Sequence, residues 1–273
     1  MSNTKTIAIT GATSGIGLAT SEELLKKGNR LIFLVRNTEK AEDVIADWDN
    51  KENIIIIKCD LADLKSVRKA GEELLQKTDK LDVLINNAGG TFHERLESKD
   101  GFELHLAVNH LGHFLLTKIS MPLLEKSKTK VINVSSEAHR AGKPDWSDLN
   151  LKKKYSTILG YGNAKLYNVL FTKSLVDKGL TSYALHPGVI DSGFGEQLPG
   201  FFKLMWKLGT PFMKSTREGA STSIYLASSN LSQDKNGSYF KDKKVKKASS
   251  LANSQAARER LWGESEKMVE GYY

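Results

Sequence analysis

Short apolar runs without polar interruption limit the folds open to this chain. Ile54-Ile55-Ile56-Ile57 and Val83-Leu84-Ile85 are apolar at every position. Continuous apolar strands are typical of a parallel sheet covered on both faces, because every side chain is then buried. The pattern predicts six strands: Thr6–Thr10, Arg30–Val35, Asn53–Cys59, Leu81–Asn86, Lys130–Ser135 and Thr181–His186.

Segments with helical periodicity separate these strands. The predicted helices are Gly15–Lys27, Thr38–Trp48, Asp63–Lys77, Gly101–Leu124 and Thr157–Lys178, and Asp63 has the position of an N-cap. Alternating strands and helices indicate an α/β fold: a doubly wound (Rossmann-type) parallel sheet with helices on both faces. One domain spanning residues 1–273 is expected, with ligands bound at the carboxyl ends of the strands.

Composition narrows the class of protein. The chain has 273 residues, 40% of them hydrophobic and 26% charged, which is ordinary for a soluble globular protein. No apolar stretch is long enough for a transmembrane helix, and the polar start before Thr6 leaves no room for a secretory signal. The single cysteine, Cys59, excludes an internal disulfide, and a cytoplasmic location is expected.

The net charge of +8 does not by itself indicate nucleic-acid binding. The lysines are dispersed apart from one cluster near the C-terminus: Lys241, Lys243, Lys244, Lys246 and Lys247. This cluster lacks the interleaved aromatic residues that stack on bases. A solvated surface is predicted there, with no nucleic-acid partner.

A glycine-rich turn follows the first predicted strand. It reads Gly11-Ala12-Thr13-Ser14-Gly15-Ile16-Gly17 and runs directly into the first helix. Glycines let the backbone approach a diphosphate, and the amides and dipole of a helix N-terminus favour its negative charge. A dinucleotide is therefore predicted to bind at Gly11, Ser14, Gly15, Ile16 and Gly17. A purely structural turn is the alternative.

Arg36 follows the second predicted strand, in the segment Leu34-Val35-Arg36-Asn37, which contains no carboxylate. An acidic residue at this position accepts a hydrogen bond from the 2′-hydroxyl of NAD, whereas an arginine accommodates the 2′-phosphate of NADP. NADP(H) is therefore the predicted cofactor. The alternative is that Arg36 is a solvated charge at a strand end.

Tyr161 and Lys165 lie four residues apart in a predicted helix, so their side chains share one face. A free tyrosine titrates near pH 10 and is a poor acid–base catalyst at neutral pH. A lysine ammonium held close to the phenol would bring that pKa down toward neutral. The pair predicts an acid–base centre in which Lys165 lowers the pKa of Tyr161.

Together these motifs resemble the short-chain dehydrogenase/reductase family over nearly the whole chain. The matching segments are Thr10-Gly11-x-x-x-Gly15-x-Gly17, Asp60-Leu61, Asn86-Asn87-Ala88-Gly89, Asn109, Ser135-Ser136, Tyr161-x-x-x-Lys165 and Pro187-Gly188. The chain is most similar to the retinol dehydrogenase-like branch, through Val108–Thr117, Asn133–His139, Asn168–Thr172, Gly237–Phe240 and Arg260–Trp262.

The resemblance implies a catalytic set of Asn109, Ser136, Tyr161 and Lys165. Tyr161 would exchange a proton with the substrate oxygen, Ser136 would hold that oxygen, and Lys165 would bind the nicotinamide ribose and lower the pKa of Tyr161. Asn109 would fix a water that links Lys165 to solvent, stabilise a kink in its helix, or do both. Ser135 is the alternative to Ser136.

The same resemblance implies further cofactor contacts. It places adenine contacts at Asp60 and Leu61, adenosine contacts at Asn87, Ala88 and Gly89, and contacts nearer the nicotinamide at Pro187, Val189 and Ser192. Ser192 stands where the family often has threonine. The six histidines are not spaced as metal ligands, so no metal is expected.

Residues 187–215 are predicted to form a substrate lid, and they are rich in apolar side chains: Phe194, Leu198, Phe201, Phe202, Met205, Trp206 and Phe212. Core or dimer packing is the alternative for them. The predicted function is hydride transfer between NADP(H) and an apolar aldehyde, ketone or alcohol. The alternatives are a regulatory protein that binds NADP(H) without turnover, and an enzyme acting on an enone or a sugar. A homodimer through Gly101–Leu124 and Thr157–Lys178 would be consistent with the family.

Overall fold

An eight-stranded sheet forms the centre of the computed structural model, which describes residues 4–188 and 214–273. Its strand order is β3-β2-β1-β4-β5-β6-β7-β8, parallel except for the antiparallel pair β7 and β8. The strands are β1 Thr6–Thr10, β2 Arg30–Val35, β3 Ile54–Lys58, β4 Val83–Asn86, β5 Lys130–Val134, β6 Thr181–His186, β7 Tyr239–Lys241 and β8 Lys244–Lys246. The predicted fold class is confirmed.

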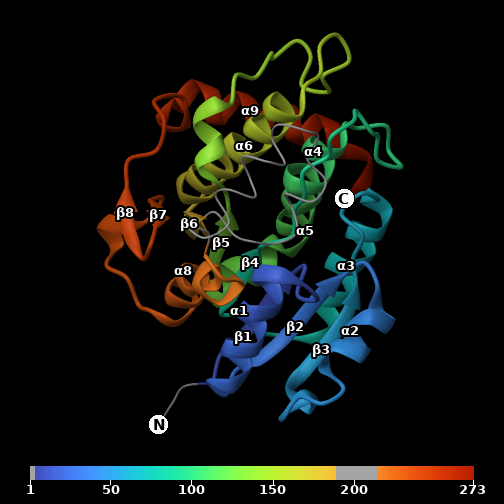
Figure 1. Cartoon of the computed structure of the whole chain (residues 1–273), viewed down its shortest axis with the longest axis vertical. Helices are drawn as coiled ribbons and strands as arrows, with labels where there is room; N and C mark the ends of the chain where they lie inside the picture. Colours follow the sequence, from blue (N-terminus) through green and yellow to red (C-terminus); the bar gives the residue numbers. More distant parts are fainter. Residues whose placement is uncertain (1–3, 189–213) are drawn as a thin grey trace.

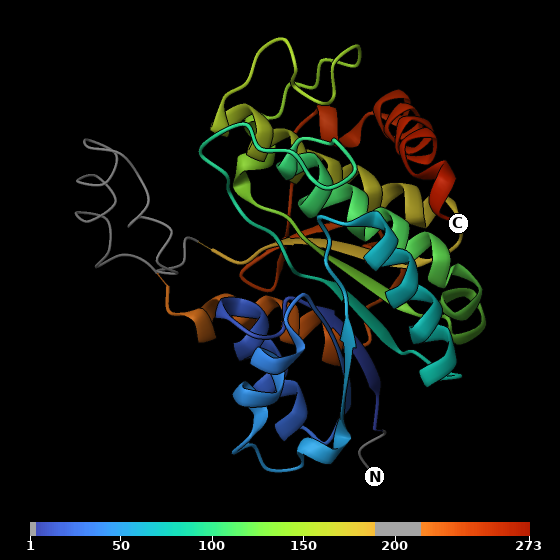
Figure 2. The same cartoon turned by 90° about the vertical axis from the view of Figure 1, so that its right-hand side faces the viewer.

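Helices cover both faces of this sheet (Figures 1 and 2). One face carries α1 Gly15–Lys26, α2 Thr38–Ile45 and α8 Thr216–Ser228. The other carries α3 Leu64–Lys77, α5 Gly112–Ser127 and α6 Thr157–Asp177, with α9 Gln255–Val269 packed outside α5 and α6. The short helix α4 Leu104–Leu106 and the π-helical turn Ala107–Leu111 lead into α5.

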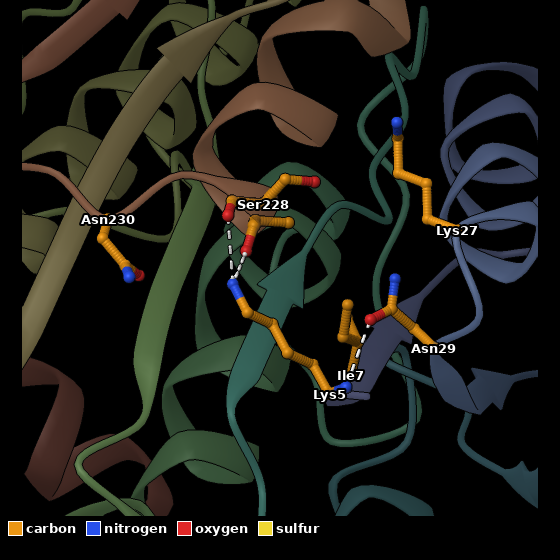
Figure 3. A pocket seen from close by; sticks show the side chains of 7 residues that line it. Lys5, Ile7, Lys27, Asn29, Ser228 and Asn230 are labelled. Carbon is orange, nitrogen blue, oxygen red and sulfur yellow. Dashed lines mark hydrogen bonds between the residues drawn. The ribbon is translucent and has the colours of Figure 1, made fainter. Parts of the chain in front are cut away.

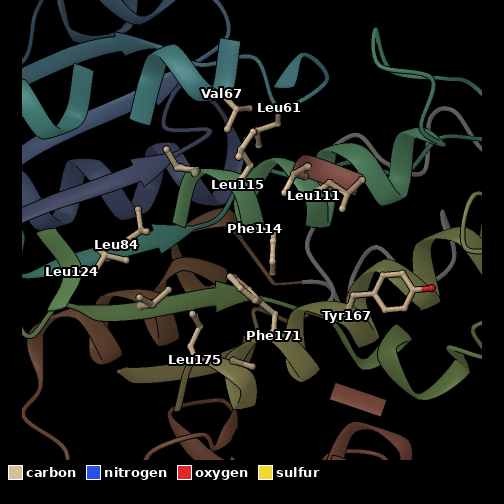
Figure 4. Close-up of a cluster of buried hydrophobic side chains, with 14 of the residues drawn as sticks. Leu61, Val67, Leu84, Leu111, Phe114, Leu115, Leu124, Tyr167, Phe171 and Leu175 are labelled. Carbon is tan, nitrogen blue, oxygen red and sulfur yellow. The ribbon is translucent and has the colours of Figure 1, made fainter. Parts of the chain in front are cut away.

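The two faces of the sheet bury separate apolar cores. The larger core joins the sheet to α3, α5 and α6, and includes Phe114, Tyr167 and Phe171 (Figure 4). The second lies under α1, α2 and α8. In β2, Leu31 and Phe33 enter one core while Ile32 and Leu34 enter the other. This two-sided burial explains why the apolar runs do not alternate with polar residues.

The predicted helix Gly101–Leu124 is interrupted in the structure. The segment Ser98–Gly101 forms a turn, the helix begins at Leu104, and the chain passes through the π-helical turn before α5. A π-helical turn shifts the hydrogen bonds by one residue, a change that apolar periodicity does not reveal. The predicted N-cap of α3 is confirmed, since the Asp63 carboxylate accepts a hydrogen bond of 3.1 Å from the Ser66 amide.

The strand order places a switch point between β1 and β4, where successive strands depart in opposite directions. Ligands on such sheets bind outside the carboxyl ends of the strands at that point. The glycine-rich turn follows β1 and the segment Asn87-Ala88-Gly89 follows β4. Within 4–188 and 214–273, no helix has the length and apolar character needed to cross a bilayer.

Candidate active site

The turn from β1 into α1 has the geometry of a diphosphate cradle. Gly11 adopts a φ of +68°, and a Cβ on Gly17 would lie 2.1 Å from the Gly11 carbonyl oxygen, so both positions require glycine. Helix α1 begins at Gly15, and its N-cap Ser14 makes no side-chain capping bond. The first amides of the helix are therefore not capped by this side chain, as an anion site at a helix N-terminus requires. The predicted dinucleotide fits here.

The segment after β4 packs directly against this turn. The Asn87 side-chain amide donates to the Thr10 carbonyl at 2.8 Å, and a Cβ on Gly11 would lie 3.0 Å from Ala88 Cα. A Cβ on Gly89 would lie 2.3 Å from Asn109 Oδ1 and 3.3 Å from Lys165 Nζ. Gly89 is thus the point at which the glycine-rich side of the crevice meets two residues of the predicted catalytic set.

Tyr161 and Lys165 lie on helix α6, which is capped by the Ser156 side chain, and Lys165 reaches Gly89 from that helix. Lys165 is almost fully buried; its Nζ donates to the Val134 carbonyl at 3.2 Å and lies 5.4 Å from the centroid of the Tyr161 ring. Burial lowers the pKa of Lys165 from 10.5 to about 8. The structure therefore places the predicted pair close together on one helix, with Lys165 beside the loop that follows β4.

The predicted electrostatic effect of Lys165 on Tyr161 needs a correction. Burial raises the pKa of the Tyr161 phenol, and the opposing effect comes from a hydrogen bond with the Ser136 side chain. The Lys165 ammonium lies 5.4 Å from the centroid of the Tyr161 ring, and burial lowers its own pKa to about 8. Sequence spacing establishes a shared helix face, but it does not include the desolvation of the phenol.

The two serines after β5 have different surroundings. The Ser135 hydroxyl is buried and donates to the Lys165 carbonyl at 2.7 Å. Ser136 is only partly buried; its Oγ accepts a bond of 3.2 Å from the Ala138 amide, and its side chain bonds Tyr161. This arrangement supports the choice of Ser136 over Ser135 as the group that meets a substrate oxygen.

Asn109 lies in the π-helical turn and is fully buried. Its Oδ1 accepts from the Gly90 amide at 2.9 Å, and its Nδ2 donates to the Gly90 carbonyl at 3.0 Å. The side chain therefore holds the loop after β4 by both of its polar atoms. A role in fixing a water stays a prediction.

The remaining predicted contacts occupy the expected edge of the sheet. Arg36 is exposed directly after β2, and Asp60 follows β3, where its Oδ1 accepts from the Ala62 amide at 3.0 Å. Leu61 is buried against Gly112. Pro187 and Gly188 follow β6. Val189, Ser192 and nearly all of the predicted lid lie outside the described residues, so their predictions stand as made.

Two groups of buried polar residues beside the site were not predicted. The Glu103 carboxylate accepts from His105 Nδ1 at 2.7 Å, and His105 Nε2 accepts from the Phe92 amide at 2.9 Å. The second group joins Thr10 to His113 at 2.9 Å. Glu103 and His105 are two residues apart, but the other partners, Phe92 and Thr10, lie on distant segments, so residue spacing gives no signal for those contacts. The cue for His113 was the histidine-containing segment Val108–Thr117.

A cavity of about 300 Å³ lies at the opposite edge of the sheet (Figure 3). It is lined by Lys5 and Ile7 at the start of β1, by Lys27 and Asn29, and by Ala227, Ser228 and Asn230. The Lys5 ammonium donates to the carbonyls of Ala227 and Ser228, so it caps the C-terminus of α8. Because it lies at the amino ends of the strands, this cavity is not the predicted crevice.

The described residues contain no cluster of three or more His, Cys, Asp or Glu that would suit a metal ion. Cys59 is buried, and burial raises the pKa of its thiol to about 12, so it is not a reactive thiolate. The polar groups that the described residues bring together around Gly89 are the Asn109 amide and the Lys165 ammonium.

A glycine-rich turn at the switch point, with a Tyr-Lys pair and a serine beside it, defines a nicotinamide-dependent oxidoreductase. The family model of the short chain dehydrogenases matches residues 5–199, and the chain belongs to that family. Within it, the chain belongs to the retinol dehydrogenase-like branch. Mouse retinol dehydrogenase 12 is 40% identical over 96% of this chain and 85% of its own length. Mouse retinol dehydrogenase 14 is 38% identical over 97% and 86%.

Solved structures agree with this assignment. A putative uncharacterized protein from Mycobacterium paratuberculosis superposes with a TM-score of 0.79 at 31% identity, covering 97% of this chain and 93% of the other. An NADPH-bound carbonyl reductase from chicken fatty liver has the same fold, with a TM-score of 0.68 at 24% identity over 89% and 99% of the two chains. The chain is thus an oxidoreductase of the short-chain dehydrogenase family, and these structures share its fold.

Proposed function

We propose that this protein is an NADP(H)-dependent oxidoreductase that interconverts an apolar aldehyde or ketone with its alcohol. The observation that carries the proposal is the convergence of Tyr161, Ser136 and Lys165 beside Gly89, at the carboxyl ends of β4 and β5. A proton donor, an oxygen-binding hydroxyl and a cation next to a dinucleotide turn are the groups that carbonyl reduction requires.

The proposed roles follow from the contacts of each side chain. When bound, the nicotinamide supplies or accepts the hydride. Ser136 holds the substrate oxygen and Tyr161 gives it a proton, which a buried phenol with a raised pKa still carries at neutral pH. Lys165 places positive charge near the oxygen that becomes negative. The raised pKa keeps the Tyr161 phenol protonated at neutral pH, which is the form that donates to a carbonyl oxygen; in the oxidation direction the phenolate would accept the proton.

Preference for NADP(H) is the second part of the proposal. Arg36 is the charged side chain directly after β2, and Asn37 next to it uses its side chain to cap α2. The guanidinium is therefore the group at this strand end that suits a 2′-phosphate. The NADPH-bound carbonyl reductase shares the fold and so adds no more than consistency.

The apolar character of the substrate rests on the relatives and on the sequence of 187–215. Retinol, which the relatives are named for, is an apolar alcohol. Nine large apolar residues lie from Phe194 to Phe212, counting both ends: the seven apolar residues of the predicted lid, Leu204 and Leu208. We propose that the substrate is an aldehyde, ketone or alcohol with a long or bulky hydrocarbon group.

The test is a panel of apolar aldehydes and ketones with NADPH, followed by loss of NADPH absorbance. Tyr161→Phe is expected to lower kcat by about 10²–10⁴-fold, the usual contribution of a general acid. Tyr167→Phe on the same helix is the matched control, since that buried hydroxyl has no hydrogen-bond partner in the part of the chain that the structure describes. Equal turnover in both variants would remove Tyr161 as the proton donor.

A further inference from the structure

The Thr10 hydroxyl is the meeting point of four polar groups at the end of β1. Its oxygen accepts hydrogen bonds of 2.9 Å from the amides of Asn87 and Ala88. A hydroxyl oxygen has two acceptor sites, so both are occupied, and the hydroxyl proton is left to donate. The available acceptors are His113 Nε2 at 2.9 Å and the Ile85 carbonyl at 3.5 Å. The shorter distance selects His113.

This hydrogen bond determines the tautomer of His113. Because Nε2 accepts, the ring proton lies on Nδ1, which donates to the Asn109 carbonyl at 3.3 Å. The ring is fully buried, and burial together with the nearby Lys165 charge lowers the pKa of His113 to about 4. His113 is therefore neutral at physiological pH, with one nitrogen donating and the other accepting.

The two hydrogen bonds of the His113 ring belong to a continuous hydrogen-bond network, which we call the circuit, that holds both ends of the loop after β4. Thr10 holds the start of that loop through the Asn87 and Ala88 amides. Asn109 holds its other end through both polar atoms of Gly90. His113 bonds both holders, and Gly89, between the two held ends, lies beside Lys165 Nζ.

We propose that His113 is a positioning residue that sets the cofactor-binding turn of β1 and the predicted catalytic Asn109 at a fixed separation. Nε2 secures the cofactor side through Thr10, and Nδ1 secures the catalytic side through the Asn109 carbonyl. The inference rests on the proposed function, because it assigns the Nε2 bond to cofactor binding and the Nδ1 bond to turnover; we call these two bonds the two arms of His113. His113 itself has no contact with the reacting atoms.

Two substitutions separate the two arms. In His113→Gln the amide oxygen can take the place of Nε2, so Thr10 keeps its acceptor and Asn109 loses its donor. In His113→Asn the shorter amide can take the place of Nδ1, so Asn109 keeps its donor and Thr10 loses its acceptor. His110→Gln is the control, since His110 is buried on the same helical segment and bonds Ser265, away from the crevice.

The measurements are the Kd of NADPH by fluorescence titration, kcat with the best substrate, and the unfolding midpoint. His113→Gln is expected to keep the NADPH Kd within about threefold and to lose kcat by about tenfold, the effect of about 1.4 kcal/mol from one lost bond. His113→Asn is expected to weaken NADPH binding by about tenfold for the same reason. The proposal would be overturned if both His113 variants lost NADPH affinity and kcat to the same extent, and if these losses followed the drop in unfolding midpoint as they do in His110→Gln.

Nitrogen-15 NMR of the histidine rings of the wild-type protein tests the circuit without any cofactor or variant. A proton on Nδ1 of His113, unchanged from pH 6 to pH 8, is expected from a pKa of about 4. A proton on Nε2 would refute the proposal even if the enzyme is active. Failure of the wild-type protein to bind NADPH or NADH would instead refute the proposed function and leave the NMR result to decide the circuit.

Discussion

Lys165 carries its ammonium group where charge is unfavourable. Burial lowers its pKa from 10.5 to about 8. At about 1.4 kcal/mol for each pH unit, the protonated lysine destabilises the fold by about 3 kcal/mol. A lysine with a lowered pKa exerts this effect at every pH below about 8, and the effect fades between pH 8 and 10.5 as the ammonium loses its proton.

Replacing this lysine should therefore stabilise the protein while stopping turnover. Lys165→Met keeps the length and volume of the side chain and loses one bond of 3.2 Å to Val134. We expect the free energy of unfolding at pH 6.5 to rise by about 2 kcal/mol and the gain to shrink toward pH 10. Urea unfolding at both values measures this, with the half-buried Lys173→Met as the control. If Lys165→Met were less stable than the wild type at pH 6.5, the buried ammonium of Lys165 would not be destabilising as we infer.

Arg36 is the residue on which cofactor choice is expected to depend. It is exposed after β2, so its replacement should leave the fold intact. Arg36→Asp places a carboxylate where a 2′-phosphate would lie and should lower kcat/KM with NADPH by about a hundredfold, since loss of a charged hydrogen bond amounts to about 1.5–3 kcal/mol. Arg30→Asp, at the other end of the same strand, is the control. Wild-type efficiency with NADH equal to or above that with NADPH would end the NADP(H) proposal.

The sequence predicted the site residues that lie close together on one helix, and it missed those whose partners are far away in the chain. Tyr161 and Lys165 were found because both lie on one helix, where spacing alone determines the shared face. The direction of the Tyr161 pKa was wrong, because burial is a tertiary property. His113 was missed as a functional residue because its partner Thr10 lies 103 residues away, and no local pattern records that contact.

At the scale of elements, the turn between β1 and α1 has the strictest steric requirement. A Cβ on Gly17 would lie 2.1 Å from the Gly11 carbonyl oxygen and 2.5 Å from Asn87 Nδ2, which no side-chain movement fully relieves. Gly17→Ala should displace the turn, weaken binding of NADPH at least about tenfold and lower stability by about 1–3 kcal/mol. Binding is measured by fluorescence titration and stability by urea unfolding.

Gly263 provides the contrasting glycine. It lies within α9, and a Cβ there would meet no atom within 4 Å. Gly263→Ala should raise stability by up to about 1 kcal/mol, because alanine is the better helix former. We therefore expect Gly17→Ala to lower the free energy of unfolding and Gly263→Ala to raise it. Normal NADPH binding by Gly17→Ala would show that the turn does not approach the cofactor closely.

The predicted bounds were accurate for three strands, whereas β4, which is buried at every position, begins two residues later than predicted. The bounds of β1, β2 and β6 match the prediction, and each of these strands is buried at nearly every position. The elements β7, β8, α8 and α9 were not predicted. All three residues of β8 are exposed, and α9 buries a narrow stripe of Ala257, Leu261, Ser265 and Val269 at spacings of four. Such elements are defined by what they pack against, not by their own hydrophobicity.

At the scale of the whole molecule, α9 packs on the outer side of α6 and contacts α5 through Trp262 (Figures 1 and 2). Trp262 packs edge-on against Phe114 of α5 at a ring separation of 4.8 Å and stacks on Phe171 of α6 at 6.1 Å. Arg258 donates to both carboxylate oxygens of Asp177, at 2.5 and 3.2 Å. These contacts lie on the two helices through which the sequence predicts a homodimer.

Because α9 covers part of α5 and α6, that part of their surface is closed to a second copy, and stable dimers need about 600–1,000 Å² on each partner. We therefore expect a mass of 30.3 kDa by light scattering at low and high micromolar concentration. Trp262 is partly buried, so Trp262→Ala should lower the free energy of unfolding by about 2–3 kcal/mol, less than the loss for a fully buried aromatic residue, and expose more of Phe114 and Phe171. If Trp262→Ala formed dimers while the wild type stayed monomeric, α9 would be the element that prevents a second copy from binding to α5 and α6. A wild-type dimer cross-linked through α5 and α6 would mean that α9 leaves that face open, and the homodimer predicted from the sequence would then hold.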